Sequence, residues 1–361
     1  MQHFLKSIKI IFSLALLTIT ANILLTSCSS KSEKELGLLP SAKGDQYEII
    51  LVMDTVKWKG PLGDQIRDIF MEEIKGLPQP EPIFTVRDIN PVAFKGFLRQ
   101  HKNLVLVTTF DATTAGTQKL KEFFTLESIN KVRENEDLFM TTQRNEFAKG
   151  QLVLNLFSKD EQTLLKHLKE NKQRIQDIFI NTERKRMEAS LFKARKKELE
   201  NALKKKHDFN LYIPEGYKLA KEEDNFVWLR YPEYDLDKNL LIYYKNYTSQ
   251  NEFNEDSIML WRERILSQYT QDPDNPNYYV DIQKIAPINQ RKVNISGKYA
   301  IETRGLWRLK ERYRGGPFVS YVFVDEDKGR IYYTEGFVYA PGGSKRQHIR
   351  ELETILKRFA S

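Results

Sequence analysis

The chain has 361 residues, of which 57 are Lys or Arg and 49 are Asp or Glu, so its formal net charge is +8. This length is enough for two domains of ordinary size. Cys28 is the only cysteine, which excludes an intrachain disulfide, an iron–sulfur cluster and a zinc site built from several thiolates.

The first 27 residues are typical of a bacterial signal peptide. Two lysines precede an apolar stretch from Ile10 to Leu25, which is shorter and more polar than the roughly 20 apolar residues that a spanning helix needs. The sequence Leu25-Thr26-Ser27-Cys28 resembles the bacterial lipobox, whose cysteine is lipidated. We therefore expect residues 1–27 to be removed, and Cys28 to carry palmitate and anchor the chain. Acylation leaves no thiol for cysteine catalysis.

Residues 28–45 are rich in Ser, Lys, Glu, Gly and Pro and lack hydrophobic periodicity, which predicts a lipidated flexible tether. Ser29 stands where many lipoproteins kept at the inner membrane have aspartate, and this favours the outer membrane. Placement on the periplasmic face and placement at the cell surface both stay open. A lipid-anchored protein of the cell envelope is not expected to bind nucleic acid.

Strand and helix patterns alternate in residues 46–157, which predicts an N-terminal α/β domain. The expected helices are Gly63–Lys75 and Pro91–Gln100. The last two strands should form a hairpin. The expected strands are Tyr47–Met53, Ile83–Ile89, Asn103–Thr109, Leu138–Thr142 and Gln151–Phe157.

Residues 158–206 form a basic segment. From Lys159 to Lys206 there are 15 Lys or Arg and 8 Asp or Glu, and apolar residues recur at helical spacing. We expect one or two long amphipathic helices, with a break near Asn181-Thr182. The basic face could lie on anionic lipid or acidic envelope polymer. We favour a solvated, salt-bridged helix that joins two domains, because acidic residues alternate with the basic ones.

Residues 207–361 predict a C-terminal antiparallel sheet with helices on one face, so the whole chain has an α+β fold with two domains. The expected helices are Asp256–Tyr269 and Ser344–Phe359. The expected strands are Phe209–Ile213, Phe226–Tyr231, Leu240–Tyr247, Tyr278–Ile285, Tyr299–Leu309, Phe318–Val324 and Arg330–Tyr339.

Several short motifs resemble an uncharacterised lipoprotein family of the Bacteroidota that is catalogued as a domain of unknown function. The motifs are Asn225-Phe226-Val227-Trp228-Leu229-Arg230, Arg304-Gly305-Leu306-Trp307, Gly315-Gly316-Pro317-Phe318-Val319-Ser320-Tyr321 and Glu335-Gly336-Phe337-Val338-Tyr339-Ala340-Pro341. The resemblance, which includes the lipobox, extends over nearly the whole mature chain. The resemblance implies a Gram-negative envelope and supplies no activity, ligand or catalytic residue.

No catalytic motif stands out in the sequence. A nucleophile elbow, a zinc-protease helix, a phosphate loop and a dinucleotide fingerprint are all absent, and no two histidines of the mature chain lie within four residues of each other. The acidic loops 272–277 and 325–329 lack the ligand pattern of a calcium loop. We therefore expect no metal and no cofactor. The alternative is a hydrolase of envelope polysaccharide or peptidoglycan, with carboxylates drawn from the second domain.

Two turns in the C-terminal domain are candidate binding elements. Around the first turn lie the candidate site residues Arg304, Trp307, Arg312, Arg314 and Phe318. These suit a glycan, peptide or anionic polymer through stacking and cation–π contacts, although we favour packing at a domain interface. The second turn, 341–346, could bind an anion at a helix start, and we favour Ser344 as an N-cap with Gln347 as its capping-box partner. The expected function is a non-enzymatic binding or assembly component with an unknown envelope protein or glycan as partner.

Overall fold

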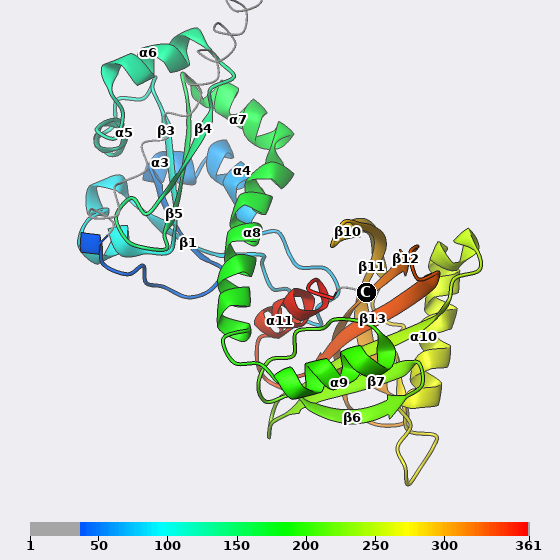
Figure 1. The fold of residues 1–361 in the computed structure, drawn as a ribbon. Coiled ribbons are helices and arrows are strands. Elements are labelled where there is room, and N and C mark those ends of the chain that lie inside the picture. Colours follow the sequence, from blue (N-terminus) through cyan, green and yellow to red (C-terminus); the bar gives the residue numbers. More distant parts are fainter. Residues whose placement is uncertain (1–36, 360–361) are drawn as a thin grey trace, which may run out of the picture.

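The computed structural model describes residues 37–359, which form two domains, each built on one β-sheet (Figure 1). The strands of the first sheet are β1 (Glu48–Met53), β2 (Thr85–Ile89), β3 (Asn103–Thr109), β4 (Met140–Arg144) and β5 (Leu152–Ser158). Its helical elements are α3 (Thr55–Trp58), α4 (Pro61–Phe70), η1 (Pro91–Ala93), η2 (Gly96–Gln100), α5 (Ala115–Lys121), α6 (Leu126–Glu134), α7 (Glu161–Glu170) and α8 (Lys172–Leu191).

The second domain contains eight strands and four helical elements among the described residues. The strands are β6 (Lys218–Glu223), β7 (Phe226–Pro232), β8 (Asp237–Asn246), β9 (Val280–Ile282), β10 (Asn289–Ile295), β11 (Lys298–Leu309), β12 (Gly315–Asp325) and β13 (Arg330–Tyr339). The helical elements are α9 (Lys197–His207), η3 (Gln250–Phe253), α10 (Glu255–Tyr269) and α11 (Arg346–Leu356).

The N-terminal sheet has the strand order β2-β1-β3-β5-β4, and all its pairs are parallel except β4 with β5. Its central strands are buried along their whole length, as continuous apolar strands in a doubly covered sheet should be. Residues of α4, α7 and α8 pack on one face. Phe94, before η2, and Leu120 of α5 pack on the other face. The predicted α/β layer is therefore confirmed.

The C-terminal sheet is antiparallel, in the order β10-β11-β12-β13-β8-β7-β6, with β9 paired to β11. The predicted α+β class with two domains is confirmed. The expectation of helices on one face is wrong, because α10 packs on one face and α9 and α11 pack on the other. Alternate residues of β13 show this directly, since Tyr333 packs toward α10 and Tyr332 toward α11.

The basic segment forms three helices, and the break expected near Asn181-Thr182 is wrong. α8 is continuous there, and the Thr182 hydroxyl donates to the Ile178 carbonyl. The chain breaks instead at Asn171, and again between α8 and α9. Lys172 on α8 lies 3.0 Å from carboxylates of both Asp68 and Glu72, so part of the basic face forms ion pairs with the N-terminal domain.

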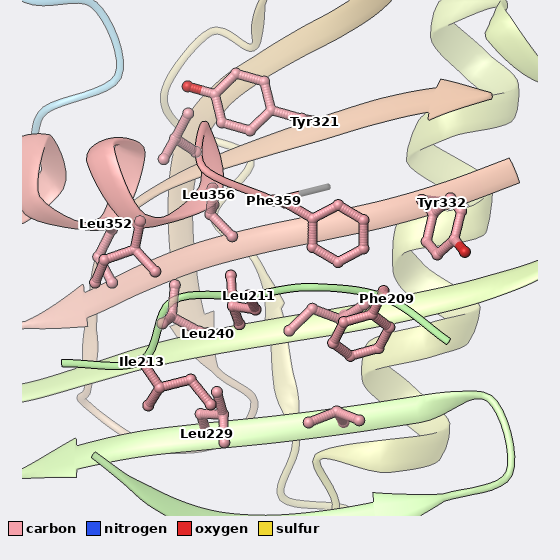
Figure 2. Close-up of a cluster of buried hydrophobic side chains, with 14 of the residues drawn as sticks. Phe209, Leu211, Ile213, Leu229, Leu240, Tyr321, Tyr332, Leu352, Leu356 and Phe359 are labelled. Carbon is pink, nitrogen blue, oxygen red and sulfur yellow. The ribbon is translucent and has the colours of Figure 1, made fainter. Parts of the chain in front are cut away.

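The expected strand Phe209–Ile213 is also wrong, because this segment has no partner strand in the described sheet. Its alternating apolar side chains nevertheless point into the core. Figure 2 shows Phe209, Leu211 and Ile213 in one cluster with residues of the sheet and of α11. The alternating pattern therefore predicted the burial of these side chains correctly, but it predicted a strand pairing that the described sheet does not contain. The helices α5 and α6 and the strands β6 and β10 were not predicted, and the helix expected at Gly63–Lys75 is α4, which ends at Phe70.

Part of the predicted tether belongs to the N-terminal domain. Ser41 pairs with Lys149 and Lys43 with His101 through isolated bridges, and the Lys149 N–H donates to the Pro40 carbonyl at 2.7 Å. The flexible-tether prediction for residues 28–45 is therefore wrong from about Pro40 onward. Cys28 lies outside the described residues, and no described helix has the length and apolar character needed to span a bilayer.

Candidate functional site

A concavity of about 830 Å³ lies at one end of the C-terminal sheet. It lies where the β11–β12 hairpin meets the segment between β13 and α11, and the N-terminal domain adds Pro78 and Gln79 to its wall. Among the charged residues lining it, four are cationic and one is acidic. They are Arg308, Arg312, Arg314, Lys345 and Glu311.

Two glycines at the start of β12 allow a close approach of its neighbours, β11 at Gly315 and β13 at Gly316. A Cβ atom on Gly316 would lie 2.0 Å from the carbonyl oxygen of Val338, and one on Gly315 would lie 2.6 Å from that of Trp307. Any larger residue would push neighbouring backbone away. These close contacts restrict the path of the loop 310–314, and the loop presents its basic side chains at the rim of the concavity.

Three cations of this loop each lie over a tyrosine ring. Arg312 lies 4.3 Å from the ring centroid of Tyr278, and Arg314 lies 4.2 Å from that of Tyr339. We call these four residues the Arg–Tyr surface. Such stacking holds a guanidinium in place without neutralising its charge.

The third cation is Lys310, beside Tyr279. Its Nζ donates to the Tyr279 hydroxyl at 2.9 Å, and this hydrogen bond raises the pKa of Lys310, which keeps the side chain charged. Among residues 37–359, no ion pair joins Lys310, Arg312 or Arg314 to a carboxylate, whereas Arg308 pairs with Asp281 at 3.2 Å. The rim therefore presents fixed positive charge that is open to an anionic partner.

The structure separates the five residues singled out from the sequence. Arg312 and Arg314 line the concavity, and Trp307 forms part of its wall, with its indole N–H donating to the Val338 carbonyl at 3.1 Å. Arg304 is half-buried on the face toward α11, where it pairs with Glu302 and Glu353. Phe318 is buried on the face toward α10.

Sequence reasoning did not single out Tyr278 or Tyr339, and it placed Lys345 in the second turn and not beside the first. Tyr278 and Tyr279 form an adjacent aromatic pair before β9, which was a usable signal. Their proximity to the hairpin depends on β9 pairing with the end of β11, and Tyr339 reaches Arg314 only because β13 lies beside β12. Both contacts depend on strand order, which the local pattern does not contain.

The turn 341–346 does not bind an external anion at the helix start, because Glu81 of the N-terminal domain occupies that position. The Glu81 carboxylate accepts the backbone N–H of Lys345 at 2.7 Å and that of Arg346 at 3.0 Å, and the Ser344 hydroxyl also donates to it. Burial by itself would raise the pKa of Glu81, but these hydrogen bonds lower it. The predicted capping box is wrong, since Ser344 caps no helical N–H and Gln347 bonds to Glu351.

The carboxyl ends of β1 and β3 are the other place where a sheet of this order commonly holds a ligand. Here Asp54, just after β1, accepts hydrogen bonds from the Val56 N–H and the Thr114 hydroxyl. A Cβ atom on Gly116 would lie 2.8 Å from the Asp54 carboxylate. The chain's own groups fill this position. Over the part of the chain that is described, no three metal-binding side chains cluster.

Comparison with protein families divides the chain in two. Residues 42–192 match the model of DUF8532 and residues 196–358 match that of DUF4837, both described as domains of unknown function. The division falls between α8 and α9. No curated protein gives a significant match.

Solved structures show only partial similarity to this chain. The Ran-binding protein Mog1p of Saccharomyces cerevisiae aligns with 42% of this chain and 88% of its own, at 7% identity and a TM-score of 0.29. A protein of Bacteroides thetaiotaomicron aligns with 42% of this chain and 44% of its own, at 11% identity and a TM-score of 0.26.

Proposed function

We propose that this protein is a lipoprotein of the cell envelope, anchored through lipid on Cys28, that binds an anionic envelope glycan through the Arg–Tyr surface. The anchor rests on the lipobox, and the outer membrane is the favoured location because of Ser29. The resemblance to a Bacteroidota lipoprotein family supports the same compartment. The anchor would hold the binding surface at the membrane, where such glycans are concentrated.

One observation carries the binding proposal. Arg312 and Arg314 lie over tyrosine rings at the rim of a concavity of about 830 Å³, and among residues 37–359 neither forms an ion pair. Guanidinium groups recognise carboxylates and phosphates through paired hydrogen bonds. Aromatic rings such as Tyr339 offer flat faces to sugar rings. Together these groups suit a polymer that carries both sugars and negative charge.

The hydrolase alternative needs a different arrangement. Glycosidases place two carboxyl groups about 5 to 9.5 Å apart across the scissile bond. The described lining of the concavity supplies one carboxylate, Glu311, which lies in the exposed loop. This lining therefore supports binding better than hydrolysis, and we propose a non-enzymatic role.

Titration with sulfated and neutral forms of one polysaccharide tests the proposal. We expect the full chain to bind dextran sulfate and not dextran, and to bind polygalacturonate as a carboxylated polymer. Affinity should fall as salt rises, because exposed charges are screened within about 8 to 10 Å at physiological ionic strength. Equal binding of dextran and dextran sulfate, or no binding of either charged polymer, would contradict it.

A further inference from the structure

A second cavity, of about 330 Å³, lies between the two domains. The segment after α4 and one face of α8 form its wall on the N-terminal side, and β10, β11 and α11 form its wall on the C-terminal side. In Figure 1, α8 descends from the N-terminal domain to α11, which brings these walls together. The cavity is separate from the concavity that carries the Arg–Tyr surface.

Most carboxylates in the wall already have cationic or amide partners. Glu302 accepts hydrogen bonds from Arg291 and Arg304, each at 2.7 Å, and Arg304 also lies 2.5 Å from Glu353. Burial by itself would raise the pKa of Glu302, but the two guanidinium groups hold it well below its ordinary range. These acids stay charged, and their close hydrogen bonds and ion pairs are made with Arg291 and Arg304.

Glu72 is satisfied in the same way at the other end of the cavity. Its carboxylate accepts from the Gln176 amide at 3.0 Å and lies 3.0 Å from Lys172. With Glu302 and Glu353, three of the four glutamates in the wall have partners. Glu73 is the fourth.

Two cations in the wall, Arg350 on α11 and Lys357 directly after it, have no carboxylate partner in an ion pair within the described residues. Arg350 is 7% exposed, its guanidinium lies 4.1 Å from the ring centroid of Tyr47, and its Nε has no hydrogen-bond partner. Lys357 is the C-cap residue directly after α11, seven positions beyond Arg350. Burial lowers the pKa of Lys357, and the nearby carboxylates of Glu353 and Glu302 offset only part of that shift.

Gln290 adds an uncharged group to the same wall. Both polar atoms of its side-chain amide are buried and have no hydrogen-bond partner within the described chain. Buried amides in folded proteins are nearly always bonded to protein, water or ligand. Two cations that form no ion pair within the described residues, and an amide without a hydrogen-bond partner there, therefore border one cavity.

We propose that this interdomain cavity binds a small anion that carries a phosphate or carboxylate group together with hydroxyl groups, as in a sugar phosphate or a sugar acid. Arg350 and Lys357 bind the anionic group, and the amide of Gln290 hydrogen-bonds a hydroxyl. The volume lies at the small end of the range for small-molecule sites, roughly 300 to 1,000 Å³. Because both domains form the wall, the bound anion stabilises their contact by mass action.

Calorimetry and thermal unfolding of the full chain test this site with four probes: glucose 6-phosphate, glucuronate, inorganic phosphate and glucose. We expect one or both sugar anions to bind and to raise the Tm, and glucose to do neither. Binding of glucose 6-phosphate alone assigns a phosphate, and binding of glucuronate alone assigns a carboxylate. Inorganic phosphate should bind at least 10-fold more weakly than the preferred sugar anion, because it carries no hydroxyl-bearing ring.

Two variants test whether the sugar anion binds in this cavity. Lys357→Met keeps the aliphatic stem, so it should fold and weaken binding at least 10-fold, and Arg350→Gln should do the same. The matched control is Arg264→Gln, at an exposed position on α10, which should bind as the wild type does. Lack of binding by both sugar anions, tighter binding of glucose or inorganic phosphate, or unchanged affinity in Lys357→Met would overturn the proposal. The Arg–Tyr surface is untouched by these variants, so its own test is independent.

Discussion

The carboxylate of Glu81, in the N-terminal domain, accepts the backbone N–H of Arg346 at the first turn of α11 in the C-terminal domain, at 3.0 Å. It also accepts from Lys345 and Ser344. A helix N-terminus carries unpaired N–H groups and partial positive charge. In this protein the carboxylate that satisfies them comes from another domain, so one residue both caps the helix and joins the two halves of the chain.

Glu81→Gln should weaken that junction. The amide oxygen can replace part of the hydrogen bonding but not the charge, and loss of a helix cap costs about 1 kcal/mol. We expect a lower urea midpoint and faster proteolysis between the domains. Glu134→Gln, at an exposed position near the end of α6, is the matched control and should leave both unchanged. A variant as stable and as protease-resistant as the wild type would show that the cap contributes little.

The folded chain should lose stability in acid. The pKa values of Glu81, Glu302 and Glu353 are all lowered in the folded chain, where each carboxylate has donors or cations beside it. A lowered pKa contributes stability above the ordinary value of 4.5 and loses it as pH falls through the folded value. The Tm should therefore stay level from pH 7 to about 5 and fall below that. Glu81→Gln should reduce the slope of this fall, and an equal slope in both proteins would contradict the assignment.

A buried ion pair stabilises the other side of the C-terminal sheet. Arg262 of α10 donates to both carboxylate oxygens of Glu335 at 2.8 and 2.9 Å, and both side chains are buried. Removing one partner leaves an uncompensated buried charge, which costs about 3 to 5 kcal/mol. We expect that loss in urea unfolding of Arg262→Met. The double variant Arg262→Met, Glu335→Leu should recover most of it, and a further loss there would rule out this explanation.

The sequence was sufficient for features that depend on local pattern. The alternation of strand and helix patterns in residues 46–157 predicted the α/β layer, and the helix α10 was placed within one residue at its start. Errors came where tertiary contacts override the pattern. Phe209–Ile213 alternates like a strand, but it is not a strand of either described sheet, and its side chains fill the core beneath α11.

The candidate site was predictable only in part, for the same reason. Arg312 and Arg314 stood out because two glycines and a proline follow them in a basic, aromatic stretch. Arg304 and Phe318 belong to the same stretch, yet strand alternation turns their side chains toward opposite faces of the sheet. Glu81 gave no local signal, because its partner lies 265 positions away at Arg346.

The lipid anchor has its own test. In cells that express the full chain, Cys28→Ala should abolish incorporation of labelled palmitate and leave an uncleaved precursor, because Cys28 is the only cysteine. Ser30→Ala, two residues further on, should label as the wild type does. Normal labelling of Cys28→Ala would refute the assignment.

The binding proposal depends most directly on the charge of the Arg–Tyr surface. The decisive measurement is the affinity for dextran sulfate at one salt concentration. It compares the wild type, the double variant Arg312→Gln/Arg314→Gln and the control Arg264→Gln. Both arginines are exposed, so the double variant should fold normally. We predict that it binds at least 10-fold more weakly while the control keeps wild-type affinity. An affinity of the double variant equal to that of the wild type would contradict the proposed function.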